Sequence, residues 1–310
     1  MNEEEVEVLQ IQSNDFFKKG EYLKAYEINK KLSDEFPQSY DFKAKCMNNL
    51  LSLKRFDEAK KIYLSILHDM KNRGCGWKLF ESQEKMKYKL PMEIKFGFLA
   101  SCVFNGYYKE AKEEALKIIE FYCKAGFNIE NSKYCKDHGY TMMNGYFSIY
   151  EFENLFIKMR ENGVDIPDFQ TAINEYHQKE EEKNEVARII KEKIIESDDN
   201  VHLRELINNH IKVFVVDRGN YMYHSLCLDR EEPFDVSKLH GATGEKTGGR
   251  AICCYMTIKE ANSVNPFAVC REIEISNLLN LMAAKSNFEV ILLKYNSDSE
   301  LIIPVDIFKI

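Results

Sequence analysis

The sequence predicts an α-helical repeat solenoid followed by a C-terminal α/β domain. Two observations carry this prediction. A motif of one aromatic residue and one alanine occurs three times in the first 125 residues, and after residue 200 the helical period gives way to short β-branched runs bounded by turn residues. We therefore expect a helical repeat domain over residues 1–200 and an α/β domain over residues 201–310.

Each copy of the motif places an aromatic residue at the start of a helix and an alanine three residues later on the same face. The pairs are Tyr22 with Ala25, Phe56 with Ala59 and Tyr108 with Ala111. The first two alanines stand 34 residues apart, which is the period of a repeat made of two helices, and the third follows after 52. The small side chain would let two helices approach closely.

A candidate first helix precedes each motif, at 7–19, 40–53 and 91–105. All three have the apolar stripe of a helix that packs on a neighbour. The residues of these stripes include Phe16, Met47, Leu50, Phe98 and Cys102.

On these residues, the segment 6–125 resembles the tetratricopeptide repeat family. The resemblance implies a right-handed helical solenoid whose concave face binds a peptide or another protein domain, and it implies no chemistry. Leu32 and Ile66 stand where the family has a small residue, and the segment 72–90, which contains Trp77, interrupts the array. We therefore expect degenerate repeats rather than a regular superhelix.

Residues 134–200 also have a helical pattern. The segment 150–163 is amphipathic with a glycine stop and resembles a single pentatricopeptide repeat, which would imply RNA binding. The charged run 177–199 has an Ile and Val face, and we interpret it as a solvated connecting helix. Its end at Asn200 sets the expected domain boundary.

The second domain is expected to contain β-strands separated by short helices. Two helices, over 258–264 and 276–284, are expected to begin at the N-caps Thr257 and Ser276. The β-branched runs that predict strands span 211–216, 250–256, 269–273, 288–293 and 301–305.

This order of elements resembles the SseB-type N-terminal domain over residues 202–310. In that family an aromatic and threonine turn opens the first helix, and an asparagine turn precedes a final strand that ends near proline. Thr257, Asn296 and Pro304 occupy those places here. The resemblance implies a small bacterial α/β domain without an assigned reaction. The family's Asn-Pro-Gly turn is absent, and the loop 217–249 is long.

The glycine-rich segment 241–249 has the residue types of a phosphate-binding loop without its spacing. Glu245 separates Gly244 from Lys246, and the following residues predict a strand where a phosphate loop has a helix N-terminus. We interpret the segment as a flexible surface loop. A nucleotide-binding enzyme that acts through His240 to Arg250 is an alternative hypothesis.

A second form of that alternative is an ADP-ribosyltransferase. His240 with Gly241, followed by the strand that ends at Tyr255, resembles the nicotinamide-binding strands of that family. The resemblance would require a catalytic glutamate, for which the candidates are Glu272, Glu274 and Glu289.

Nucleophilic catalysis by a cysteine is a third form of the enzyme hypothesis. Cys253 or Cys254 could pair with His224 or His240. Both cysteines lie in an apolar strand, where burial is the better explanation of a free thiol.

Composition narrows the functional classes. The net charge is −7, and acidic and basic residues alternate, which disfavours a nucleic-acid partner. Nine cysteines at irregular spacing predict reduced, buried thiols and no zinc site. No apolar run reaches the length of a membrane helix, and the N-terminus is acidic, so we expect a cytoplasmic protein.

We expect a non-enzymatic protein-protein interaction or adaptor protein without cofactor, metal or catalytic residues, whose protein or peptide partner binds the concave helical face.

Overall fold

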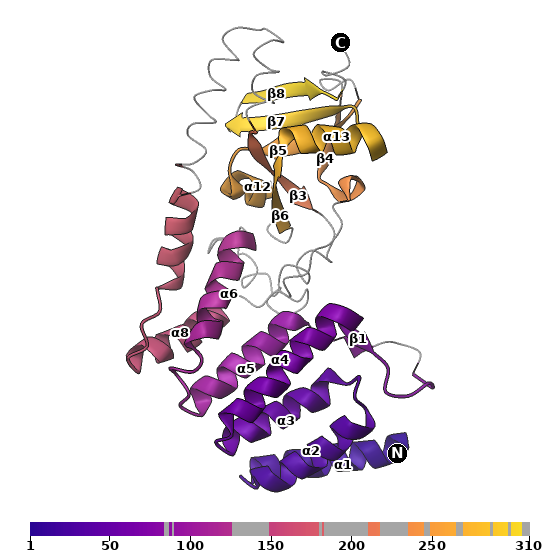
Figure 1. Ribbon diagram of the computed structural model, residues 1–310, viewed down its shortest axis with the longest axis vertical. Coiled ribbons are helices and arrows are strands. Elements are labelled where there is room, and N and C mark those ends of the chain that lie inside the picture. The colour runs from indigo at the N-terminus through magenta and orange to yellow at the C-terminus, as the bar shows by residue number, and fades with distance from the viewer. Residues whose placement is uncertain are drawn as a thin grey trace. The chain divides into compact units, whose positions relative to one another are not determined.

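A computed structural model describes residues 1–83, 87–88, 90–125, 149–179, 182, 210–217, 235–244, 249–264, 269–285, 288–296 and 299–305. The chain divides into two compact units (Figure 1). The helical unit holds Met1–Ile118 and the described part of Lys133–Asp168, and the sheet unit holds the described parts of Ile119–Ser132, Phe169–Leu226 and Glu231–Ile310. The boundary expected at Asn200 and most of the expected helix 177–199 lie outside the described residues.

The helical unit begins with five helices that pack in sequence. Helix α2 packs on α1 and α3, and α3 packs on α4 and α5, so neighbours in the chain are neighbours in space. The five helices are α1 (Glu3–Lys18), α2 (Tyr22–Glu35), α3 (Tyr40–Ser52), α4 (Phe56–Arg73) and α5 (Pro91–Phe104). The helices predicted over 40–53 and 91–105 are confirmed to within one residue.

Helix α1 starts four residues earlier than the apolar pattern predicts, and its cap explains why. The Asn2 side chain accepts a hydrogen bond from the Glu5 N–H at 2.8 Å, and the Glu5 carboxylate accepts one from the Asn2 N–H at 2.9 Å. This reciprocal capping box satisfies two N–H groups that a helix start would otherwise leave unpaired. Glutamates in the first turn also complement the helix dipole.

The three motif copies share one turn geometry. The residue two positions after the first helix of each pair has a positive φ, namely Gly20 at 77°, Lys54 at 63° and Gly106 at 80°. The next residue donates its N–H to a carbonyl five positions earlier, and all three bonds measure 2.9 Å: Glu21 to Phe16, Arg55 to Leu50 and Tyr107 to Cys102. This is the hydrogen bond of a Schellman C-cap. The three motif alanines follow at the same place in each copy and are fully buried.

The third copy departs from the first two in one respect. Tyr22 and Phe56 are the first residues of α2 and α4, as predicted, but Tyr108 precedes the helix α6 (Lys112–Ala125) by four residues. The motif residue Ala111 is nevertheless buried, and its N–H donates to the Tyr107 carbonyl at 3.1 Å. The turn geometry is therefore repeated although the helix begins later.

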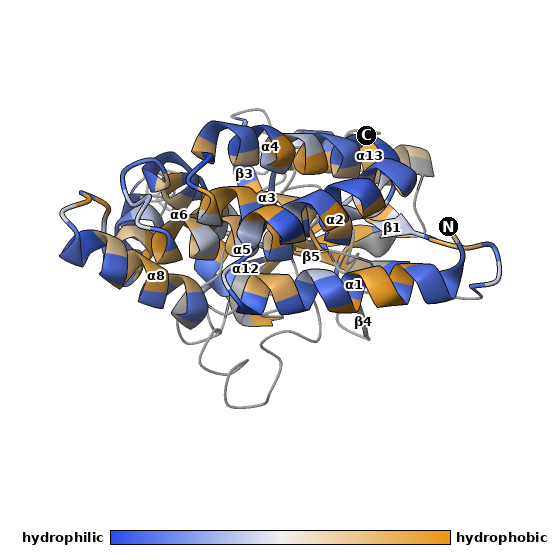
Figure 2. Ribbon diagram, turned by 90° about the horizontal axis from the view of Figure 1, so that it is seen from below, coloured by the Kyte–Doolittle hydropathy of each residue, from blue (hydrophilic) through white to orange (hydrophobic). Residues whose placement is uncertain are grey.

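Aromatic side chains fill the space between α4 and α5. Tyr63 and Phe98 stack with ring centroids 4.2 Å apart, and Phe56 lies 6.1 Å from Phe98. The helices of this unit are amphipathic, with both polar and apolar residues on each helix (Figure 2). Helix α8 (Ile149–Glu161) packs on α5 and ends before Gly163, as the sequence predicts for 150–163.

The sheet unit is a mixed α/β structure. Its strands run in the order β6-β3-β5-β7-β8, and β4 pairs with β5 beside β3. The pair β5 and β7 is parallel and the other pairs are antiparallel. The elements are β3 (Lys212–Asp217), β4 (Gly241–Gly244), β5 (Gly249–Tyr255), α12 (Ile258–Val264), β6 (Val269–Glu274), α13 (Ile275–Lys285), β7 (Val290–Asn296) and β8 (Ser299–Pro304).

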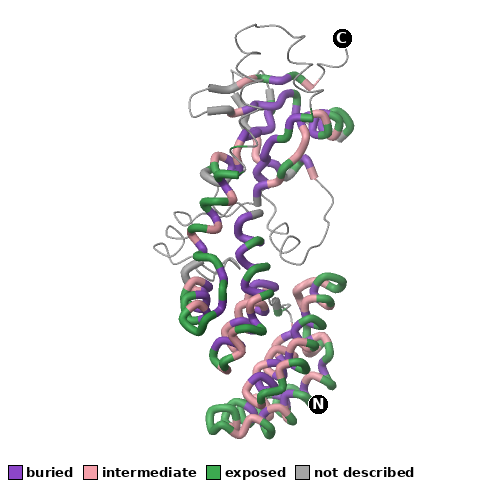
Figure 3. Tube along the Cα trace, turned by 60° about the vertical axis from the view of Figure 1, so that its left-hand side comes forward, coloured by how far each residue is buried: buried purple, intermediate pink, exposed green. Residues whose placement is uncertain are grey.

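One helix covers each face of this sheet. Leu278 and Met282 of α13 pack with Cys254 of β5, whereas Ile258 of α12 packs with Cys253 on the opposite face. Because successive strand residues point to opposite faces, the neighbouring cysteines lie in different cores. The strands β3, β5 and β7 are buried over most of their described length, as expected of the middle of a sheet with both faces covered (Figure 3).

The predicted strands and helices of the second domain are confirmed, with two corrections. Thr257 is the N-cap of α12, since its Oγ1 accepts the Glu260 N–H at 3.2 Å. Ser276, however, lies inside α13, which starts at Ile275. The glycine-rich segment, interpreted as a loop, is in part the strand β4. No helix of the described residues is long and apolar enough to cross a membrane.

Candidate functional site

The described residues of the segment 72–90, between α4 and α5, fold back onto the helices that precede them. Gly74 ends α4 with a φ of 86°, and the strands β1 (Gly76–Trp77) and β2 (Lys87–Tyr88) then form a short antiparallel pair. The Phe80 ring lies edge-on to Phe36 at 5.4 Å. The Tyr40 hydroxyl donates to the Gly74 carbonyl at 2.7 Å, and burial raises the pKa of Tyr40 to about 12.

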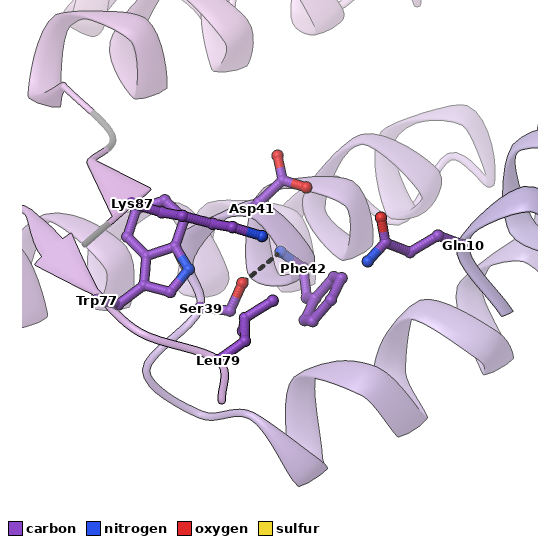
Figure 4. Close-up of a pocket in the computed structure, with 7 residues that line it drawn as sticks. All are labelled: Gln10, Ser39, Asp41, Phe42, Trp77, Leu79 and Lys87. Carbon is purple, nitrogen blue, oxygen red and sulfur yellow. Dashed lines mark hydrogen bonds between the residues drawn. The ribbon is translucent and has the colours of Figure 1, made fainter. Parts of the chain in front are cut away.

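This return of the chain encloses a pocket of about 400 Å³ in the helical unit (Figure 4). Such a volume lies at the lower end of the range found for small-molecule sites. Helix α1, the start of α3 and the inserted segment each supply part of the wall. The lining residues are Gln10, Ser39, Asp41, Phe42, Trp77, Leu79 and Lys87.

Trp77 is the most informative residue of the pocket. Its side chain is only 6% exposed and packs edge-on against Tyr40 at 5.4 Å, yet its indole N–H has no hydrogen-bond acceptor among the described residues. A buried donor without a partner costs about 1 to 3 kcal/mol. Figure 4 shows this nitrogen turned toward the Ser39 hydroxyl and the Lys87 ammonium, on the pocket side of the ring.

The other polar groups near Trp77 include a cation and a helix N-terminus. Lys87 is the cross-strand partner of Trp77, and its ammonium reaches the same side of the pocket. Ser39 caps α3 by accepting the Phe42 N–H at 3.5 Å, so the positive end of the α3 dipole also faces this space. The carboxylate of Asp41 pairs with Lys45 at 3.1 Å.

The walls beside these donors are apolar. Phe42 and Leu79 belong to a cluster around Val6 and Leu32, which fixes their positions. The pocket can therefore hold an apolar side chain while its donors contact a carbonyl or carboxylate oxygen.

Sequence reasoning did not identify this site. Trp77 was noted only as part of an interruption, and none of the other lining residues belongs to a motif. Two signals were available, because Trp77 is the single tryptophan of the chain and stands in the segment that breaks the repeat period.

In the sheet unit, the glycine-rich segment forms one antiparallel pair. Gly244 of β4 lies opposite Gly249 of β5, and residues 245–248, with Glu245 and Lys246, lie outside the described residues. The element that follows is β5, as predicted, so no helix N-terminus follows Gly249 to hold a phosphate.

The candidate glutamates are spread along the sheet. The His240 N–H bonds to the Val216 carbonyl near the end of β3, whereas Glu274 lies opposite Lys212 at its start. Glu272 pairs with Lys212 at 2.9 Å and Glu274 with His210 at 3.2 Å. Only Glu289 is close to the glycine-rich hairpin, through its N–H bond to the Arg250 carbonyl at 2.9 Å.

The described cysteines are almost all buried, as the sequence predicts. Cys75 is the exception and is half-buried. Burial raises the pKa of Cys46, Cys102 and Cys270 to about 12 and that of Cys123 to about 11, and it holds the pKa of the fully buried Cys254 well above its ordinary value. Cys253 is buried beside it, and His224 lies outside the described residues.

These thiols should resist alkylation in the folded protein. With a pKa near 12, only about one thiol in ten thousand is ionised at pH 8, against about a quarter at the ordinary pKa of 8.5. In a background with Cys135→Ser and Cys227→Ser, iodoacetamide should modify Cys75 before every other cysteine, as read by peptide mass mapping. Rapid modification of Cys253 or Cys254 would instead indicate a reactive thiol in β5.

Comparison of the chain with protein-family models, curated proteins and solved structures gives no significant match. Within the described ranges, no group of three or more His, Cys, Asp or Glu side chains is arranged to hold a metal ion.

Proposed function

We propose that this protein is a non-enzymatic adaptor that binds a peptide segment of another protein through its helical unit. The observation that carries the proposal is the pocket of Figure 4, where apolar walls surround a buried indole N–H without an acceptor. Phe42, Trp77 and Leu79 supply apolar surface beside the polar lining residues, and binding pockets typically combine apolar surface with a few precisely placed polar groups.

The recurrence of one turn geometry supports the tetratricopeptide resemblance. Three positive-φ turns with equal 2.9 Å capping bonds, each followed by a buried alanine, are what a degenerate array of paired helices requires. In such arrays helices provide the rigid scaffold and inserted segments modify the binding surface. The proposed partner site therefore includes Trp77, Leu79 and Lys87 of the inserted segment and is not confined to a concave helical face.

The sheet unit is proposed to be an SseB-like domain in a cytoplasmic protein. The support is the order of elements from β5 through α12, β6, α13 and β7 to β8, with Thr257 at the helix cap. Its cysteines point into two cores, which gives this unit a structural rather than a catalytic use of its thiols.

A peptide selection on the full chain tests the adaptor proposal. A displayed library of random 12-residue peptides should yield a family of related binders. Their binding should be lost in Gln10→Phe, which fills part of the pocket from α1 without adding a charge, and kept in Gln12→Phe, which makes the same change at an exposed position of α1 outside the pocket. Failure to enrich any related peptides, or equal binding to both variants, would overturn the proposal.

A further inference from the structure

Two polar side chains of the pocket in the helical unit can only donate hydrogen bonds, the Trp77 indole N–H and the Lys87 ammonium. The start of α3 adds the positive end of its dipole, and the Gln10 amide of α1 can donate or accept. The one carboxylate of the wall, Asp41, is already paired with Lys45 and is turned away from Trp77 in Figure 4. A ligand that complements this pocket must bring acceptor oxygens.

Lys87 makes a negatively charged acceptor the best match. Its side chain is exposed, and no carboxylate of the described residues lies within ion-pair distance of its ammonium. Because Trp77 and Lys87 face each other across β1 and β2, one carboxylate can contact both groups. Hydrogen bonds from such donors to a charged acceptor are shorter and stronger than those to a neutral one.

The net charge of −7 does not oppose this preference at the pocket itself. Charges farther from the ligand than about 8 to 10 Å are screened at physiological ionic strength, whereas Lys87 and the α3 terminus act at contact distance. The preference for an anionic ligand should therefore be local and should weaken only moderately with salt.

The apolar walls specify the neighbouring group of the ligand. Phe42 and Leu79 lie opposite the donors and leave room within the cavity of about 400 Å³ for a bulky aliphatic side chain. A carboxylate next to such a side chain is found in peptides where Asp or Glu neighbours Leu, Ile or Met.

Entry of this ligand requires one movement. The Trp77 nitrogen is buried, and the Lys87 side chain runs beside the ring in Figure 4. Lysine has a flexible stem, so its ammonium can follow the incoming carboxylate and uncover the indole N–H. Binding should then give this N–H an acceptor.

We infer that the pocket binds an internal peptide segment in which an acidic side chain neighbours a bulky aliphatic one. Lys87 pairs with the carboxylate, Trp77 donates its N–H to the same group, and Phe42 with Leu79 holds the aliphatic side chain. This inference rests on the proposed adaptor function but makes a narrower claim about the ligand.

Three pools of seven-residue peptides test the inference on the full chain. All have random flanking positions; two are capped at both ends and carry Leu-Glu or Leu-Gln at the centre, and the third carries Leu-Gln with a free C-terminal carboxylate. Trp77 is the single tryptophan, so its fluorescence and its indole N–H resonance report the pocket alone. The Leu-Glu pool should bind at least tenfold more tightly than the capped Leu-Gln pool and should shift the indole N–H downfield.

Variants of the inserted segment separate the role of the Lys87 ammonium from that of the Trp77 N–H. Lys87→Gln should weaken the Leu-Glu pool about tenfold and leave the Leu-Gln pool unchanged, whereas Lys78→Gln, at an exposed position of the same segment, should change neither. Trp77→Phe keeps the aromatic ring and removes the donor, so it should also weaken the Leu-Glu pool, measured by calorimetry.

Each contrary result has a distinct meaning. Equal binding of the two capped pools, or no binding of the Leu-Glu pool, would overturn the acidic preference. Tightest binding of the pool with a free carboxylate would replace the internal segment by a chain terminus. If the 12-residue selection yields binders that depend on Gln10 but lack acidic residues, the adaptor function stands and this inference fails.

Discussion

Phe98→Ala should lower the free energy of unfolding of the helical unit by about 3 to 5 kcal/mol. Phe98 is 2% exposed, stacks on Tyr63 and approaches Phe56, so its removal leaves a cavity between α4 and α5 that rigid helices cannot close. A domain has about 5 to 15 kcal/mol of stability in total, so the loss should be large. Urea unfolding followed by Trp77 fluorescence measures it, because Trp77 lies in the same unit.

Phe104→Ala is the matched control for this substitution. Phe104 is the last residue of the same helix and is 79% exposed, with the Lys158 ammonium 5.2 Å from its ring centroid. Loss of an exposed ring and one cation–π contact should cost no more than about 1 kcal/mol. A similar cost for the two substitutions would mean that the packing of α5 differs from that described.

The helices of the first half could be predicted because their signal is local. Tyr22, Ala25, Phe56 and Ala59 stand in one short motif, and the motif determines a turn, a helix start and a buried contact together. The positive φ of Lys54 could not be predicted in the same way, since lysine has no preference for the left-handed region. The structure explains this conformation. The Arg55 N–H that follows Lys54 donates to the Leu50 carbonyl, and the equivalent bonds follow Gly20 and Gly106 in the other two copies.

The pocket could not be predicted because it depends on contacts between distant segments. Trp77 contacts Tyr40, and Phe80 contacts Phe36. The chain that forms α3 and α4 lies between the two partners of each contact, so both contacts join residues that are far apart in the sequence. A sequence predicts helices and strands through the period at which apolar residues recur. The apolar residues of the inserted segment 72–90 recur at no such period. The strand β4 was missed for a related reason, since Gly241 and Gly244 have low strand preference and become a strand by pairing with β5.

Gly241→Ala should destabilise the sheet unit by about 1 to 3 kcal/mol. A Cβ atom at this position would lie 2.7 Å from the carbonyl oxygen of Ala251 and 2.7 Å from Cε1 of Phe288. The oxygen belongs to the backbone of β5, and the Phe288 ring is held under the Arg250 guanidinium at 5.0 Å, so neither can move freely. Pulsed alkylation along a urea gradient measures the effect, because Cys253, Cys254 and Cys270 become reactive when the sheet opens.

Gly97→Ala tests whether the cost at Gly241 comes from the close approach or from the loss of glycine itself. Gly97 lies within α5, and a Cβ atom there would meet nothing within 4 Å. Alanine should therefore stabilise the helical unit by about 0.5 to 1 kcal/mol, because glycine in a helix loses more backbone entropy on folding. The two substitutions are chemically identical, so opposite signs would locate the effect in the contact of β4 with β5 and Phe288. Unchanged unfolding of the sheet unit in Gly241→Ala would mean that β4 does not approach β5 as closely as these distances require.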